Sequence, residues 1–208
     1  MLQRIRFLLV LFLFLFGLTQ LHAQAPQPFS ADFVTTTAQS GKIAGKWYVA
    51  MPKMRLDVTS MPQQQAGPFG GTMSMISDTA TQTTYMLMPQ QQMYMEFHGD
   101  RQQSPGLHEM LHFKGGSDPC ANDPEKTCKK LGTETVNGRS CDKWEITDKN
   151  SRKGTAWLDQ KLRFPVKVQG NDGTLMELSN IKEGAPDPAV FAIPPGYKAF
   201  DPSAYGKQ

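Results

Sequence analysis

The sequence predicts a mainly β protein with few short helices, folded as a curved antiparallel half-barrel of about eleven strands. From residue 29 to residue 97, apolar and polar residues alternate with a period near two, which is typical of half-buried strands. Short turn sequences rich in Gly, Pro and Asn separate these segments. So many strands in one chain must curl to bury one face, which is why we expect a half-barrel.

The N-terminus resembles a targeting segment. Arg4 and Arg6 precede an apolar run over residues 7–18, and Leu21-His22-Ala23 ends in a small residue suited to cleavage. The run is short for a bilayer span. We therefore predict a cleaved signal peptide over residues 1–23, with an uncleaved anchor as the alternative, and a single β domain over residues 24–208.

The charge of the chain is nearly balanced. Removing the two signal-peptide arginines from the formal net charge of +3 leaves +1. This value does not favour nucleic acid as a partner. No second apolar run is long enough to span a membrane, so we expect no stable membrane insertion after signal cleavage. The expected location is the periplasm or the cell exterior.

Three strands are expected before residue 61. Phe29, Ala31 and Phe33 share one face of the first, which runs to about residue 37. The second carries Trp47 on its apolar face and ends at Pro52. The third is a half-buried strand with three apolar residues at alternate positions, which are Met54, Leu56 and Val58.

Methionine pairs dominate the next three strands, between residues 71 and 97. Residues two apart share a face of a strand, so one side of the sheet should carry Met73, Met75, Met86, Met88, Met93 and Met95. Thioether side chains are apolar and flexible, and such a wall suits either an ordinary core or an adaptable ligand cavity. Cu(I) is an alternative ligand, because soft thioethers select it.

Residues 98–130 interrupt the strand pattern. Ser104 and Pro105 begin one short predicted helix that ends before Gly115-Gly116 and acts as a flap over the sheet. Within it, HEMLH places His108 and His112 on one helix face with Glu109 between them, and Asp118 follows at third-ligand spacing. The motif gives a zinc endopeptidase, with Glu109 as general base, as an alternative function. The surrounding strands argue against it, because zincin proteases pack the motif helix on a preceding long helix.

Strands resume at residue 130. Asn137-Gly138 is a two-residue hairpin turn between the strands over residues 130–136 and 140–147. Further strands cover residues 154–159, 164–169 and 174–181, and Pro165 indicates an edge or a bulge. Near the C-terminus, PDPAVF forms a short turn that leads into IPPGYKAF.

Three cysteines are expected to form one disulfide in an oxidising compartment. The Asn137-Gly138 register pairs Val136 with Arg139, so that Cys141 faces Glu134 and Cys128 faces Thr147. Cys128 and Cys141 are then too far apart to bond. We predict a Cys120–Cys128 disulfide, with Cys141 on a polar face as a thiol that is either free or intermolecular.

The C-terminal half resembles the end of a LolA/LolB-type domain. The matching segments are LGTETVNGRSCDKWEI, KGTAWLDQKLRFPVKVQ, GTLMELSNI and VFAIPPGYK. They are most similar to secreted members of that superfamily without an assigned activity. The resemblance implies an incomplete, strongly curved antiparallel barrel with an apolar concave face. Relatives carry the acyl chains of lipoproteins across the periplasm, or sense them.

Together these observations predict a non-enzymatic periplasmic binding protein that needs no cofactor. Its partner would be a lipid or an acylated protein held on the apolar concave face. The candidate lining residues are the six paired methionines above together with Trp47, Trp144 and Trp157.

Overall fold

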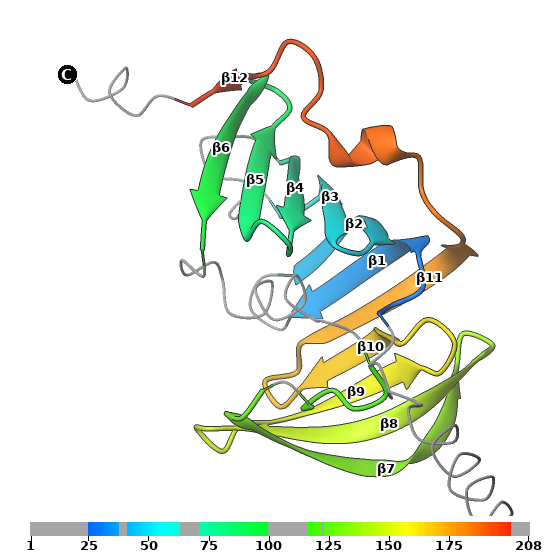
Figure 1. The fold of residues 1–208 in the computed structure, drawn as a ribbon. Helices are drawn as coiled ribbons and strands as arrows, with labels where there is room; N and C mark the ends of the chain where they lie inside the picture. The colour runs from blue at the N-terminus through cyan, green and yellow to red at the C-terminus, as the bar shows by residue number, and fades with distance from the viewer. Residues whose placement is uncertain (1–24, 38–40, 63–70, 100–115, 122, 201–208) are drawn as a thin grey trace, which may run out of the picture.

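The computed structural model describes residues 25–37, 41–62, 71–99, 116–121 and 123–200. Within these ranges twelve strands form one curved sheet in the order β12-β6-β5-β4-β3-β2-β1-β11-β10-β9-β8-β7 (Figure 1). The elements are β1 (Phe29–Thr37), β2 (Gly41–Ala50), β3 (Lys53–Ser60), β4 (Met73–Asp78), β5 (Thr83–Met88), β6 (Met93–His98), β7 (Lys126–Val136), β8 (Arg139–Asp148), β9 (Lys153–Asp159), β10 (Phe164–Gly170), β11 (Leu175–Glu183), the 3₁₀ helix η2 (Pro188–Phe191) and β12 (Lys198–Ala199).

The predicted fold class is confirmed. Neighbouring strands pair antiparallel except β12 and β6, which pair in parallel, and the sheet remains open instead of closing into a barrel. β1 and β11, from opposite ends of the chain, pair in its middle. The predicted helix over residues 104–113 and the predicted signal peptide lie outside the described residues. Within the described residues, no helix has the length and apolar character needed to cross a bilayer.

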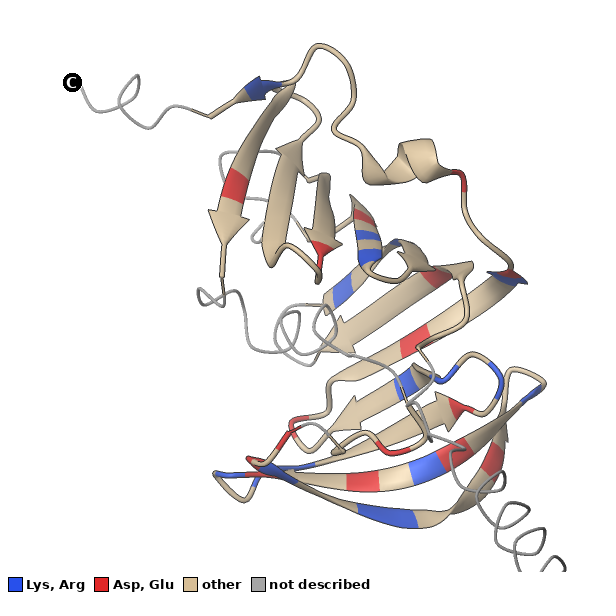
Figure 2. Ribbon diagram, viewed as in Figure 1, with Lys and Arg blue, Asp and Glu red and all other residues tan. Residues whose placement is uncertain are grey.

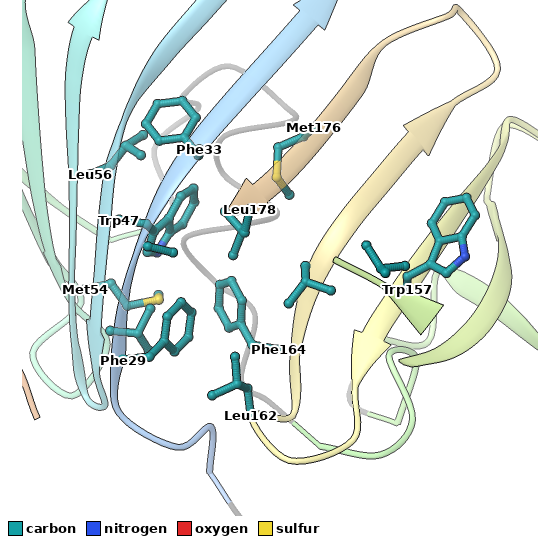
Figure 3. Close-up of a cluster of buried hydrophobic side chains, with 14 of the residues drawn as sticks. Phe29, Phe33, Trp47, Met54, Leu56, Trp157, Leu162, Phe164, Met176 and Leu178 are labelled. Carbon is teal, nitrogen blue, oxygen red and sulfur yellow. The ribbon is translucent and has the colours of Figure 1, made fainter. Parts of the chain in front are cut away.

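The strand alternation decides which side chains face inward. Phe29, Ala31 and Phe33 in β1 are buried, and so are Met54 and Leu56 in β3. Figure 3 shows the labelled side chains of β1 and β3 meeting Phe164 of β10 and Leu178 of β11 inside the curve of the sheet. The inner cluster comprises Phe29, Ala31, Phe33, Trp47, Val49, Met54, Leu56, Val58, Met75, Val136, Cys141, Trp157, Leu162, Phe164, Val166, Met176 and Leu178.

A second, smaller cluster lies on the outer face of β2 to β6. Ile76 and Leu87 alternate with the inward methionines and pack with Phe191 of η2. The segment that follows β11 crosses this outer face (Figure 1). Arg55 of β3 holds this segment on the sheet, because its Nη1 donates a hydrogen bond to the Val190 carbonyl at 2.8 Å. The C-terminal segment therefore covers the outer face and leaves the inner face to the sheet itself.

The hairpin register agrees with the sequence near the turn and departs from it farther away. Asn137 and Gly138 have φ values of 50° and 78°, as a two-residue primed turn requires. Glu134 faces Cys141 as predicted. A bulge between Lys130 and Gly132 then shifts the register by one residue, so the expectation that Cys128 faces Thr147 is wrong, and Cys128 faces Ile146.

A second bulge lies at Pro165, where the sequence predicted an edge or a bulge. The register of β10 against β9 shifts between Pro165 and Lys167. β10 lies between β9 and β11, so Pro165 marks a bulge and not an edge strand. Phe164 and Val166, two residues apart, both enter the inner cluster, and the regular pairing resumes at Lys167.

Buried and half-buried charges join β11 to the β8–β9 hairpin. The Asp159 side chain is only 2% exposed, and it pairs with the Nε of Arg139. Asp159 Oδ1 also accepts from the backbone N–H groups of Lys161 and Leu162, at 2.8 and 2.7 Å. Arg139 Nη2 donates to Glu183 of β11 at 2.9 Å. This network holds the end of β9 against the turn into β10.

Gly45 provides a stability test of the inner packing. A Cβ atom there would lie 1.8 Å from the Asp57 carbonyl oxygen and 2.7 Å from Phe33 Cε1. Because both neighbours belong to packed strands, we expect Gly45→Ala to lower the free energy of unfolding by about 1–3 kcal/mol. Urea denaturation measures this. Gly71→Ala is the control, since no atom lies within 4 Å of a Cβ there, and equal losses in both variants would contradict the prediction.

The Glu183 contacts predict a pH dependence of stability. Hydrogen bonds from Lys161 and then Arg139 hold the pKa of Glu183 below its ordinary 4.5. A carboxyl with a lowered folded-state pKa contributes stability above its unfolded pKa, and this stability is lost as the pH falls through the folded value. We expect Glu183→Gln to lose less stability than wild type between about pH 5 and about pH 3. Urea midpoints at several pH values measure the slopes, and identical slopes would disprove the contribution.

Candidate functional site

The six paired methionines lie on one face of the sheet. Met75 faces Met86 across β4 and β5, and Met86 in turn faces Met95 across β5 and β6. Met88 faces Met93 in the same way. Directly paired residues of antiparallel strands point to the same side, and Met73 shares the face of Met75 because it is two residues away. The cross-strand register therefore gathers these side chains into a continuous surface.

This surface continues into the inner cluster. Met54, Met75 and Met176 belong to the buried part of the cluster, and Met51, Met61 and Met73 pack against it. With Met86, Met88, Met93 and Met95, all ten methionines of the described residues lie on the inner face. We call this surface the methionine face.

The outer face differs in chemistry. All four tyrosines of the described residues pack in the outer cluster, namely Tyr48, Tyr85, Tyr94 and Tyr197. Their hydroxyl groups tolerate water while their rings are half-buried. Flexible thioethers are thus confined to the inside of the curve and rigid amphipathic rings to the outside.

Exposure increases along the methionine face toward β6, which pairs with the short edge strand β12. Met75 is 1% exposed and Met88 is 2% exposed. Met86, Met93 and Met95 are half-buried, and so is Phe97 on the same face of β6. The inner face between β1 and β3 is filled by its own side chains, whereas its β5–β6 end presents partly exposed apolar atoms. An apolar partner would first meet the protein at this end.

Charges are distributed unevenly between the two halves of the sheet (Figure 2). β4, β5 and β6 together contain only two carboxylates, Asp78 and Glu96, and no lysine or arginine. The other half, from β7 to β11, has several cross-strand ion pairs, including Lys130–Asp142 at 2.7 Å and Lys167–Glu177 at 3.1 Å. The methionine-rich end is consequently the half of the sheet that carries little charge.

The three tryptophans occupy different environments. Trp47 is 1% exposed at the centre of the inner cluster, where its ring packs on Phe33 and Phe164. Trp157 lies at the margin of the cluster, and its Nε1 donates to Glu134 Oε2 at 2.7 Å. Trp144 belongs to neither cluster. The structure therefore brings Trp47 together with the methionines, leaves Trp157 at the margin and places Trp144 elsewhere.

Trp157 has a structural environment rich in charge. The ammonium groups of Lys143 and Lys167, on the two neighbouring strands, lie 5.1 and 5.2 Å from the centre of its ring. Hydrogen bonds from Lys143 and then Trp157 lower the pKa of Glu134. These contacts order the β7–β10 part of the sheet.

The predicted zinc motif cannot be placed, because His108, Glu109 and His112 lie outside the described residues. Asp118, the proposed third ligand, accepts a hydrogen bond from the backbone N–H of Cys120 at 2.8 Å. Its carboxylate lies within 4.8 Å of the sulfur atoms of Cys120 and Cys128. Because these sulfurs are bonded to one another, they are not available as thiolate ligands.

The cysteine assignments are partly confirmed. The Cys120–Cys128 disulfide forms, with a Cα–Cα distance of 5.7 Å. Cys141 is free, but the expectation that it lies on a polar face is wrong. It is 0% exposed and belongs to the inner cluster, because near the Asn137-Gly138 turn it shares with Val136 the side of the hairpin that packs inward. Burial removes it from intermolecular pairing.

Sequence reasoning found the methionine pairs but missed several residues that build the same face. Phe164, Leu178 and Met176 come from strands far along the chain, and only the β1–β11 pairing brings them opposite β2 and β3. Their alternation was a signal that they are buried. It carried no information about which residues they would meet.

Comparison with known proteins places the chain in a sequence family. The family described as "Domain of unknown function (DUF4412)" matches residues 33–163, which is more than half of the chain. A comparison with curated proteins gives no match.

Solved structures share the fold at low sequence identity. An uncharacterized conserved protein from Thermus thermophilus is similar over 84% of this chain and 90% of that chain, at 8% identity and a TM-score of 0.56. A chain of the Pseudomonas aeruginosa MucA/MucB complex is similar over 80% of this chain, at 15% identity and a TM-score of 0.51. This chain spans only 55% of that one.

The similar structures also include a protein of the superfamily that the C-terminal half of the sequence resembles. A LolA superfamily protein from Nitrosomonas europaea is among the similar structures, covering 82% of this chain and 90% of that chain at 10% identity and a TM-score of 0.33. Identities this low do not identify a ligand or a partner.

The buried thiol gives a direct test of the inner packing. Burial raises the pKa of Cys141 from 9.0 to about 11, and only the thiolate reacts rapidly with disulfide reagents. In unreduced protein at about pH 8, we expect Ellman's reagent to detect almost no thiol in the native state and one thiol per chain in denaturant. Cys141→Ala should show none in either state. Rapid native reaction would contradict the burial, and two or more thiols in denaturant would contradict the disulfide.

Proposed function

This chain belongs to the family described as a domain of unknown function, DUF4412, and we propose that it is a non-enzymatic periplasmic protein that binds a lipid or a lipid-modified partner on its methionine face. The predicted signal peptide supports the periplasmic location. The observation that carries the proposal is the gathering of all ten described methionines on the inner face, with partial exposure at the β5–β6 end.

The chemistry of this face suits hydrocarbon chains of variable shape. Methionine side chains have several rotatable bonds and polarizable sulfur, so they repack around irregular apolar groups. Removing an acyl chain from water contributes about 0.8 kcal/mol for each buried methylene. Because β4 to β6 carry few charges, a bound chain would displace little hydration of ionic groups there.

The type of partner follows from the fold by analogy. MucB forms a complex with MucA, so a protein that shares this fold holds another protein. The sequence also resembles lipoprotein carriers, whose cargo bears acyl chains, and this resemblance suggests that the partner is acylated. By analogy, the partner of this chain would be an acylated protein or a free lipid. Its hydrocarbon chain would contact the methionine face.

The cross-strand methionine row also favours Cu(I) binding as a second candidate. Met75, Met86 and Met95 lie at one level of three adjacent strands, so their flexible thioethers can approach a common ion. Soft thioethers select Cu(I). Metal analysis of protein purified under reducing conditions separates the two candidates, because stoichiometric copper without bound lipid would favour the metal.

The lipid proposal predicts bound hydrocarbon and a charge-sensitive face. Native mass spectrometry of detergent-free protein purified from cells should show adducts with lipid masses. A fluorescent fatty acid should bind, and Met93→Asp should weaken its binding by about tenfold or more, because it places a carboxylate on the apolar face. Gln91→Asp is the matched control, since it adds the same charge at an exposed turn position two residues away.

A loss of ligand binding in the variants is informative only if they remain folded. Circular dichroism and thermal melting must show that both variants retain the wild-type fold. If wild type binds neither cellular lipid nor the fluorescent fatty acid, the proposed function is wrong. If it binds and both variants bind equally well, the ligand lies on a different surface.

A further inference from the structure

Trp47 holds a polar group at the centre of the inner face. Its ring packs edge-to-face on Phe33 and on Phe164, with centroid distances of 6.1 and 5.9 Å. In Figure 3 it lies between the β1–β3 side chains and Leu178 from the opposite half. The side chain is 1% exposed, so its indole N–H is removed from bulk water.

This N–H has no hydrogen-bond acceptor among the described residues, since Trp47 Nε1 is buried and unpartnered. The other side-chain donors of the inner cluster are satisfied. Trp157 Nε1 donates to Glu134 Oε2 at 2.7 Å, and Cys141 Sγ donates to the Arg139 carbonyl at 3.5 Å. Buried donors without an acceptor are rare and destabilise the folded state. An orphan donor inside a proposed binding face therefore calls for an acceptor that the described residues do not supply.

The orphan donor lies on the same cross-strand row as the exposed methionines. Trp47 faces Leu56, Leu56 faces Met75, and Met75 leads through Met86 to Met95. Four strand spacings of about 4.8 Å separate Trp47 from Met95, or about 19 Å. The inner face around Trp47 is filled by its own side chains, so a hydrocarbon chain that enters at the half-buried β6 end has to displace some of them to reach the indole. The flexible thioethers along this row are the side chains best able to make room.

The surroundings of Trp47 decide what kind of acceptor fits. The buried residues that the structure describes include no lysine, arginine or histidine. Lys46, the preceding residue, points to the other face and lies 3.4 Å from Asp32. A carboxylate buried here would have one donor and no compensating charge, which is strongly unfavourable. A neutral carbonyl needs only one good donor.

We propose that the indole N–H of Trp47 donates a hydrogen bond to the carbonyl oxygen of a bound acyl ester or amide. This inference rests on the proposed function and narrows it. The preferred ligand class is a long-chain neutral acyl compound, as found in glycerolipids and in acylated protein termini, which binds more tightly than a free fatty acid or a plain hydrocarbon. The methionine face receives the chain, and Trp47 positions its carbonyl.

The test compares three ligands of equal chain length on wild type, Trp47→Phe and Trp144→Phe. Displacement of a fluorescent apolar probe measures the affinities for methyl palmitate, palmitate and hexadecane. Wild type should bind methyl palmitate about tenfold more tightly than hexadecane, the effect of one buried hydrogen bond. Trp47→Phe should abolish this preference, because it weakens the binding of methyl palmitate more than the binding of hexadecane. Trp144→Phe removes the other unpartnered indole N–H, which lies outside the cluster, and should behave as wild type.

A spectroscopic readout on the wild-type protein makes the test independent of the variants. The Trp47 Nε1–H resonance, assigned by NMR, should shift downfield with methyl palmitate and not with hexadecane. Absence of that shift in a protein that binds methyl palmitate would overturn the inference while the proposed function stands. Equal affinities of wild type and Trp47→Phe for the ester would do the same, and tighter binding of palmitate would overturn the neutral ligand class. Failure of all three ligands to bind would remove the proposed function itself.

Discussion

The structure depends on aromatic packing across the inside of an open sheet. Phe164 of β10 lies 5.2 Å from Phe29 and 5.9 Å from Trp47 between ring centroids, so one ring joins the N-terminal and C-terminal parts of the chain. The two edges of the sheet, β7 and β12, do not pair with each other. Because backbone hydrogen bonds do not close the barrel, the curvature is held by these buried side chains.

That constraint separates the chemistry of the two faces. The inner face collects methionine, phenylalanine and tryptophan, whereas the outer face of β2 to β6 collects tyrosine and is covered by the segment around η2. Arg55 of β3 holds the segment around η2 on this outer face, since its guanidinium donates a hydrogen bond to the Val190 carbonyl. The C-terminal segment thus packs on the outer face, and the methionines of β5 and β6 on the inner face are in part exposed.

The two halves of the sheet also reach stability by different means. From β7 to β11, ion pairs and a buried Arg139–Asp159 contact accompany the core. From β4 to β6, there is almost no charge, and methionine packing predominates. Charged pairs and their hydrogen bonds fix geometry, whereas thioethers adapt. The half that is poor in charge is therefore the half suited to changing shape around a ligand.

The sequence by itself determined the strands, the hairpin turns and the shared face of the methionine pairs, because a period of two and a primed turn are local properties. The Cys120–Cys128 bond followed from the same local register. Only the tertiary structure decided that Cys141 is buried, that Cys128 faces Ile146, and that Trp47 joins the methionines while Trp144 does not. Bulges shift register by one residue without a clear sequence signal, and the pairing of β1 with β11 joins segments that are far apart along the chain. Burial depends on those non-local contacts, so alternation alone could not assign it.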